Sequence, residues 1–143
     1  MTLFVLDASV AAKWALPPSG EKFTAEALEL LDRFGKGQIN FIVPDLFWAE
    51  LANVLWKAVR IGRATAVNAQ SAMSEIRQRG LITISSESVI ERALSIAIAF
   101  DRSAYDSVYV ALAVASKCEL VTDDEKLANA LAAHFPVKWL GSL

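Results

Sequence analysis

Short apolar runs alternate along the chain with longer segments in which apolar residues recur at every third or fourth position. The runs are typical of buried strands, and the longer segments predict helices that turn one apolar face toward a core. We predict strands at residues 3–6, 39–43, 81–84, 120–122 and 137–140. We predict helices at residues 9–16, 21–34, 45–59, 65–79, 87–100 and 103–116, with a last helix that begins at Asp124.

This alternation of strands with helices predicts an α/β fold, an α/β/α sandwich in which a parallel sheet of about five strands has helices on both faces. Right-handed crossovers would join the strands. The chain shows no repeat, low-complexity stretch or linker, and 55% of its 143 residues are hydrophobic. Since this composition can fill one core, residues 1–143 are expected to form a single domain.

Local signals set the ends of several predicted helices. Ser9 and Asp45 have side chains that accept hydrogen bonds from free backbone N–H groups, so both are expected to cap helices. Pro17 and Pro18 should stop the first helix, because proline lacks a backbone N–H and disfavours helix in the preceding residue. The glycine-rich segment at residues 35–37 should end the second helix.

The charge and cysteine counts exclude several classes of protein. Fourteen Lys and Arg against sixteen Asp and Glu give a net charge of -2, which excludes binding of nucleic acid by overall charge alone. The longest apolar run, at residues 108–115, has eight residues, whereas a membrane span needs about 20. The first residues lack the features of a secretory signal, so a cytoplasmic protein is expected. With a single cysteine, Cys118, and a single histidine, His134, the chain has no Cys/His set for zinc.

Acidic residues fall where the predicted strands and helices should meet. Asp7 ends the first strand, and Asp123 and Asp124 directly follow the fourth. In an open parallel sheet the ligand site lies beyond the carboxyl ends of the strands. Glu50 and Asp106 would lie near helix N-termini that open on the same edge. We therefore expect these acids to converge.

Carboxylates within roughly 4 to 6 Å raise one another's pKa, so a cluster stays ionised only if cations are present. Mg²⁺ and Mn²⁺ prefer oxygen ligands and keep waters that leave room for phosphate oxygens. The acids therefore indicate metal-assisted hydrolysis of a phosphodiester. Setting four of them aside leaves 14 basic against 12 acidic residues (16 minus 4), a slightly positive remainder.

Four motifs together resemble those of PIN domains, and in particular the VapC-type ribonuclease toxins of toxin–antitoxin pairs. They are Asp7-Ala8-Ser9-Val10, Glu50-Leu51-Ala52-Asn53-Val54-Leu55, Tyr105-Asp106-Ser107-Val108-Tyr109-Val110-Ala111-Leu112-Ala113 and Leu120-Val121-Thr122-Asp123-Asp124. Their order and spacing agree with that family over the whole chain.

The resemblance implies a sheet of order 3-2-1-4-5 and a metal-dependent endoribonuclease. The implied metal-binding and catalytic acids are Asp7, Glu50, Asp106 and Asp124, with Ser9 and Thr122 as supporting polar residues. Asp123 occupies the variable place of the fourth motif and is a possible alternative to Asp124. The resemblance further implies Mg²⁺ or Mn²⁺ as cofactor, RNA as substrate, a homodimer, and a cognate antitoxin that covers the site.

Simpler interpretations stay open for the same acids. Asp106 follows Ser103 by three residues, which is also a capping-box arrangement. Thr122 has the same relation to Glu125 and is a second candidate cap. Glu50 shares a helix face with Asn53 and Lys57, as a solvated residue would. The alternative function is a non-cleaving PIN-fold module that binds metal, RNA or a protein.

Residues outside the motifs are assigned mostly structural roles. The four tryptophans, Trp14, Trp48, Trp56 and Trp139, are expected in the core or in a dimer contact, with base stacking as the alternative. Candidate phosphate contacts are Lys13, Arg102 and Lys126. Cys118 is interpreted as a buried thiol and His134 as structural. We expect an antitoxin to cover the helices around residues 23–34 and 47–59.

Overall fold

The computed structural model describes residues 2–143 and contains one parallel sheet of five strands. The strand order is β3-β2-β1-β4-β5, which confirms the α/β prediction and the predicted order. The strands are β1 (Thr2–Leu6), β2 (Ile39–Pro44), β3 (Ile82–Ile84), β4 (Glu119–Thr122) and β5 (Val137–Trp139).

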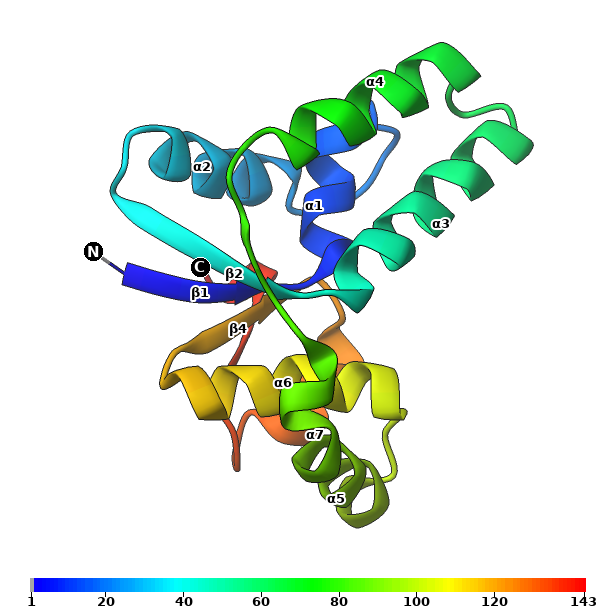
Figure 1. Ribbon diagram of the computed structural model, residues 1–143. Coiled ribbons are helices and arrows are strands. Elements are labelled where there is room, and N and C mark those ends of the chain that lie inside the picture. Colours follow the sequence, from blue (N-terminus) through cyan, green and yellow to red (C-terminus); the bar gives the residue numbers. More distant parts are fainter. Residues whose placement is uncertain (1) are drawn as a thin grey trace.

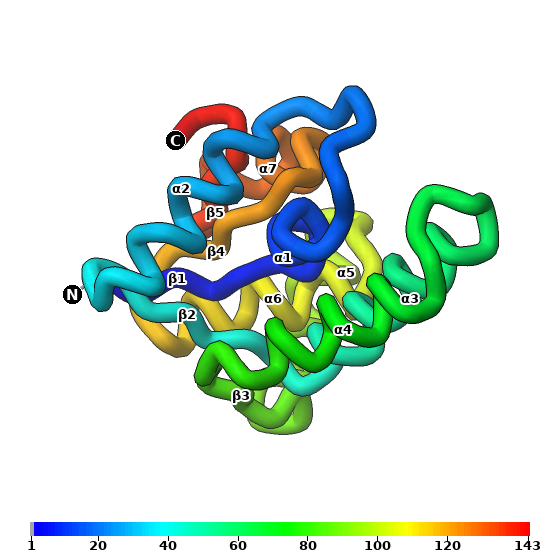
Figure 2. Tube along the Cα trace, turned by 90° about the horizontal axis from the view of Figure 1, so that it is seen from above, coloured from blue at the N-terminus to red at the C-terminus, as the bar shows by residue number. Residues whose placement is uncertain are grey.

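Helices cover both faces of this sheet (Figure 1). They are α1 (Ala8–Ala15), α2 (Thr24–Gly35), α3 (Leu46–Arg60), α4 (Ala66–Arg77), α5 (Ile90–Phe100), α6 (Ala104–Ser116) and α7 (Glu125–Leu131), with short 3-10 turns η1 (Ser86–Val89) and η2 (Leu140–Ser142). Helices α1 and α2 lie on one face, and α5, α6 and α7 lie on the other. Helices α3 and α4 form an antiparallel pair that extends beyond the sheet, as the view from above also shows (Figure 2).

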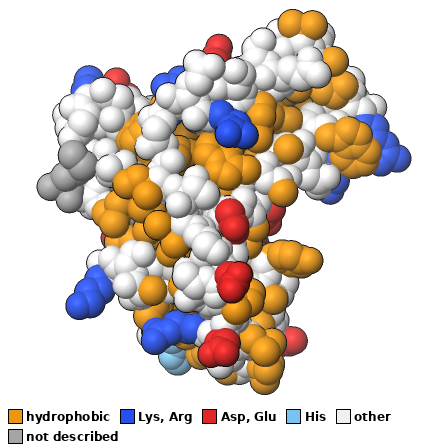
Figure 3. Space-filling view, in the orientation of Figure 1, with side chains coloured by type: hydrophobic (Ala, Val, Ile, Leu, Met, Phe, Trp, Pro, Cys, Tyr) orange, Lys and Arg blue, Asp and Glu red, His pale blue; other side chains and the backbone are white. Residues whose placement is uncertain are grey.

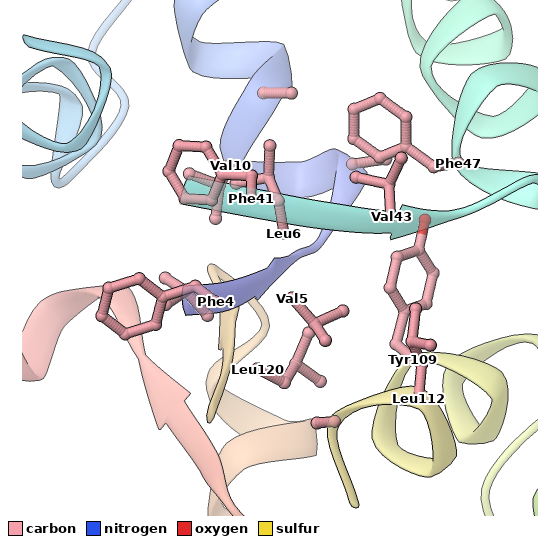
Figure 4. Packing of buried hydrophobic residues seen from close by; sticks show 14 of the residues in the cluster. Phe4, Val5, Leu6, Val10, Phe41, Val43, Phe47, Tyr109, Leu112 and Leu120 are labelled. Carbon is pink, nitrogen blue, oxygen red and sulfur yellow. The ribbon is translucent and has the colours of Figure 1, made fainter. Parts of the chain in front are cut away.

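The core lies on both faces of the central strands, which explains why their sequences are apolar without alternation. Val5, Leu6 and Leu120 are fully buried, and Phe41 and Phe47 pack on the α1 side (Figure 4). The parallel register pairs Leu6 with Val121, so β1 and β4 end side by side. The residues that follow these two strands therefore meet at one edge of the sheet.

Two predicted helices begin later than expected. Phe23 has φ of 66°, a left-handed conformation that an α-helix cannot contain, so α2 starts at Thr24 instead of residue 21. Residues 86–89 form the η1 turn, so α5 starts at Ile90 instead of residue 87. The last strand ends at Trp139, because the chain enters the η2 turn at Leu140.

Neither of two predicted side-chain caps forms a capping hydrogen bond, although Asp45 occupies the predicted position. Ser9 is inside α1, where its hydroxyl donates to the Asp7 carboxylate. Asp45 occupies the N-cap position of α3, but its carboxylate accepts a hydrogen bond from the Ser86 N–H at 3.1 Å instead. Ser9 thus bonds to the residue that precedes its own helix, and Asp45 bonds to the η1 turn. Within residues 2–143, no helix combines the length and the apolar character that a membrane crossing requires.

Candidate active site

Asp7 lies at the carboxyl end of β1, partly buried, at the start of α1. Two hydroxyls donate to the same carboxylate oxygen, Oδ2: Thr122 Oγ1 at 2.6 Å and Ser9 Oγ at 3.0 Å. Burial raises the pKa of Asp7, the two hydroxyls oppose that rise, and the charge of Asp106 adds to it. Ionised Asp7 is therefore costly in the metal-free protein.

The same two hydroxyls join the end of β1 to the loop after β4. Thr122, which is fully buried, accepts a hydrogen bond from the Asp124 N–H at 3.0 Å. Ser9 Oγ accepts one from the Asp123 N–H at 3.1 Å. The alternative role of Thr122 as a helix cap is wrong, because Asp124 caps α7 by accepting from the Leu127 N–H at 3.0 Å.

Glu50 lies near the beginning of α3 and is half-buried. The Tyr109 hydroxyl, on α6, donates to its Oε1 at 2.5 Å. Figure 4 shows the Tyr109 side chain pointing from α6 toward the end of β2. Burial raises the pKa of Glu50, and the charges of Asp7 and Asp106 raise it further against the opposing effect of Tyr109.

Asp106 lies in the first turn of α6, whose N-terminus Ser103 caps by accepting from the Asp106 N–H at 3.0 Å. The Ser103 cap is therefore confirmed. Burial raises the pKa of Asp106, followed by the charge of Asp124, while Arg102 lowers it. Arg102 Nη2 lies 4.0 Å from Asp106 Oδ2, which is too long for a hydrogen bond.

Charge interactions thus connect all four acids at one edge of the sheet. Asp7 and Asp106 raise the pKa of Glu50, Asp106 raises that of Asp7, and Asp124 raises that of Asp106. They are not packed around a common point: within residues 2–143, no three Asp, Glu, His or Cys side chains form a ready metal-binding group. The arrangement is a convergent but open group of carboxylates, which is called the acidic pocket below.

Asp123 differs from Asp124 in its partners. Its carboxylate forms an ion pair with Lys13 Nζ at 3.2 Å, and Lys13 also donates to the Lys22 carbonyl at 2.7 Å. Lys13 is therefore engaged within the protein, and the prediction that it contacts phosphate is not supported by its position. Asp123 is neutralised locally, whereas the charge of Asp124 acts on Asp106.

Sequence reasoning missed Tyr109, because it stands in the middle of an apolar helical run. A usable signal was its spacing: Tyr109 follows Asp106 by three residues, which places both on one face of α6. His134 packs against Phe100 with ring centroids 5.2 Å apart, in line with a structural role. Cys118 is only partly buried, and its pKa is raised by that burial.

Three of the four tryptophans have structural contacts. The indole N–H of Trp14 donates to the Ala27 carbonyl at 2.8 Å, that of Trp48 to Thr83 Oγ1 at 3.0 Å, and Trp139 packs edge-on against Phe23. Trp56 differs, since it is 53% exposed on α3.

Residues 4–131 match the sequence model of the family described as PIN domain. The chain belongs to the PIN domain family. It is 32% identical over 135 residues to ribonuclease VapC9 of Mycobacterium tuberculosis, covering 94% of this chain and 96% of that protein. The resemblance to VapC-type ribonucleases that the four motifs predict is thereby confirmed.

Solved structures show the same PIN fold. The crystal structure of PAE2754 from Pyrobaculum aerophilum superposes with a TM-score of 0.72 at 19% identity, over 99% of this chain and 85% of that one. A toxin–antitoxin complex from Klebsiella pneumoniae gives a TM-score of 0.62 at 18% identity, over 96% of both chains. The fold of this PIN domain thus has counterparts in known proteins.

Proposed function

We propose that this protein is a divalent-metal-dependent endoribonuclease of the VapC type. The ribonuclease relative supports the activity. The acidic pocket supports the metal, because Mg²⁺ and Mn²⁺ prefer oxygen ligands and the pocket offers carboxylates without a competing Cys or His.

The donor set fits such an ion in one specific respect, which carries the proposal. Asp7, Glu50 and Asp124 each use one carboxylate oxygen in a hydrogen bond within the protein. The second oxygen of each remains as a ligand. Since the pKa values of Asp7, Glu50 and Asp106 are raised, a bound cation would remove the cost of keeping them ionised.

The side chains have separate tasks in this proposal. The residues that would hold the ion are Asp7, Glu50, Asp106 and Asp124. Ser9 and Thr122 fix the orientation of Asp7. When bound, the ion supplies a water of lowered pKa for attack on the phosphate and offsets charge on the leaving oxygen. Arg102, beside Asp106, is placed to donate hydrogen bonds to a phosphate oxygen.

RNA cleavage with and without metal tests the proposal. The wild-type protein should cleave a single-stranded RNA in Mg²⁺ or Mn²⁺, and EDTA should abolish the activity. Asp7→Asn should be inactive under all conditions. Cleavage that persists in EDTA and in Asp7→Asn would refute the proposal, and Mn²⁺ binding without any cleavage would support the non-cleaving alternative instead.

An antitoxin is the second proposed partner. The similar fold of the Klebsiella toxin–antitoxin complex supports it. An apolar groove of about 280 Å³ lies between α3 and α4, and its lining includes Leu55, Trp56, Val59 and Met73. An apolar partner helix in this groove would lie on the segment at residues 47–59 predicted to be covered. Copurification of a small protein from the native host, and its loss in Met73→Asp, would test this.

Other properties implied by the resemblance stay predictions. A homodimer is supported by three exposed apolar side chains four residues apart on α5, Ile90, Leu94 and Ile98. Sedimentation of wild type and Leu94→Glu would test it. A single domain over residues 1–143 and a cytoplasmic location also remain predictions.

A further inference from the structure

The outer part of α3 carries a basic face that the proposed site does not use. Lys57 and Arg60 are exposed there, together with Asn53. Glu50 is the only acidic residue of the helix, and it belongs to the pocket. The face of α3 formed by Asn53, Lys57 and Arg60 is called the α3 basic face below.

Helix geometry places this face in line with the acidic pocket. At 3.6 residues per turn, Asn53, Lys57 and Arg60 lie within about 80° of Glu50 around the helix axis. At 1.5 Å per residue, Lys57 lies about 10 Å and Arg60 about 15 Å along the axis from Glu50. A strand that passes the pocket along α3 therefore meets the two cations in succession.

The two cations have no acidic partner in the described part of the chain. The ion pairs found in residues 2–143 involve Lys13, Lys36, Arg63 and Arg102, but neither Lys57 nor Arg60. Lys57 and Arg60 are three residues apart, where like charges repel. An anion bound between them would relieve that repulsion.

Arg60 is held in place by an aromatic side chain. Its guanidinium lies over the Trp56 ring, 5.4 Å from the ring centroid. Trp56 also lines the apolar groove between α3 and α4, so it separates that groove from the α3 basic face. In the space-filling view, Asp and Glu side chains lie near the middle of the visible face, and Lys and Arg side chains lie at the outer end of the α3–α4 pair (Figure 3).

We propose that the α3 basic face is an RNA-binding track, on which Lys57 and Arg60 contact phosphates of the strand about three to five nucleotides from the cleaved bond. The distance of three to five nucleotides follows because the two cations lie about 10 and 15 Å from Glu50, and a stacked strand rises about 3.4 Å per nucleotide. This inference rests on the proposed ribonuclease function and assigns its substrate a path. It also explains how a protein of net charge -2 binds a polyanion: the cations are gathered beside the pocket.

The test compares two double variants of equal charge change. Lys57→Gln/Arg60→Gln removes the track. The control is Arg92→Gln/Lys117→Gln, and both of these side chains are exposed. Asp106 lies in the first turn of α6, whereas Lys117 follows the C-terminal end of that helix. Arg92 lines a surface hollow together with Ala115, which is near the same C-terminal end. Cleavage of a single-stranded RNA of about twelve nucleotides and of a trinucleotide is measured in Mn²⁺.

For the longer RNA, the track variant should show a KM about tenfold higher than wild type with kcat within about twofold, while the control stays near wild type. In the Asp7→Asn background, anisotropy of the labelled RNA should show the slope of log Kd against log salt reduced by roughly 1.4, or 0.7 per lost contact. The trinucleotide should not distinguish the variants, because it is too short to reach both cations.

Two outcomes would overturn the inference while the ribonuclease function stands. One is a track variant that cleaves and binds the longer RNA like the control. The other is an unchanged affinity for RNA together with loss of a copurifying small protein, which would assign the face to a protein partner. If the wild-type protein cleaves no RNA, the proposed function itself fails, and the inference fails with it.

Discussion

The acidic pocket has two halves that are built differently. The strand half consists of Asp7, Thr122 and the loop after β4, joined by several hydrogen bonds around the fully buried Thr122 side chain. The helix half consists of Glu50 and Asp106, which are half-buried and lie on two separate helices. Glu50 is connected to the other helix by one hydrogen bond, from Tyr109. The first half is thus fixed to the core through Thr122, and the second is a set of adjustable ligands.

The largest effect on stability is expected from Thr122→Val, which tests the strand half. The change keeps the shape but removes the donor to Asp7 and the acceptor for the Asp124 N–H. Leaving buried polar groups unpaired should lower the free energy of unfolding by about 3 kcal/mol, measured by urea denaturation. Thr83→Val, which removes an exposed hydroxyl that accepts from Trp48, is the control and should cost under about 1 kcal/mol. If both variants lose the same free energy of unfolding, the buried hydrogen bonds of Thr122 contribute no more to stability than the exposed one of Thr83.

Tyr109→Phe tests the helix half and should give the opposite result. Loss of one hydroxyl frees Glu50 to turn toward water, so the affinity for Mn²⁺ should fall about tenfold. The free energy of unfolding should change by only about 1 kcal/mol. Titration calorimetry with Mn²⁺ measures the first effect, and Tyr105→Phe, at a tyrosine that is 69% exposed, is the matched control. Mn²⁺ affinity that is the same in both variants would contradict a positioning role for Tyr109.

The pH dependence of stability separates the pocket from the rest of the surface. The folded-state pKa values of Asp7, Glu50 and Asp106 are raised, so their contribution is most favourable below the ordinary carboxyl pKa and is lost as pH rises through the raised values. When the pH is lowered from 7 toward 5 in EDTA, these three groups become protonated more readily in the folded state, so their effect on Tm should be an increase.

Asp7→Asn should weaken that pH effect, because it removes a carboxylate whose pKa is raised by burial. Asp45 is the internal contrast: hydrogen bonds from Ser86 lower its pKa, so the stability that it adds is lost only as pH falls below the ordinary value. Thermal unfolding of wild type and Asp7→Asn in EDTA at both pH values is the measurement. If Tm changes with pH by the same amount in both proteins, the carboxylate of Asp7 does not cause the pH effect.

The smallest effect is expected for Arg102→Gln at the rim of the helix half. Arg102 lies 4.0 Å from Asp106, and such a long ion pair contributes little to stability. The Tm of the variant should therefore stay within about 1 °C of wild type. Its proposed phosphate contact predicts a KM several-fold higher in the RNA cleavage assay. An unchanged KM would remove Arg102 from the proposed substrate contacts, where Lys13 is already engaged with Asp123.

The strand half was largely predictable from the sequence, because its acidic residues directly follow apolar strands that the sequence itself marks. An acid at the end of an apolar strand, and a Thr followed by acids at the end of another, must meet if the strands are neighbours in a parallel sheet. The strand order itself came from the family resemblance of the four motifs. The ranges of α6 and β1 followed from caps and apolar runs, which are also local signals.

The parts that failed depend on contacts between distant segments. Ser9 and Asp45 look like helix caps in sequence, but Ser9 Oγ accepts a hydrogen bond from the Asp123 N–H, 114 positions away, and the Asp45 carboxylate accepts one from the Ser86 N–H, 41 positions away. The bond from Tyr109 to Glu50 joins residues 59 positions apart, and no spacing rule along one helix predicts it. The left-handed backbone of Phe23 is equally invisible in a hydrophobic pattern.

A crystal soaked in Mn²⁺ and measured for anomalous scattering tests the central claim most directly. We predict a peak in the acidic pocket, contacted by carboxylate oxygens of Asp7 and of at least two residues among Glu50, Asp106 and Asp124, with Thr122 still donating to Asp7. A peak held by other residues, or an ordered pocket that binds no Mn²⁺ while these carboxylates point apart, would contradict the account.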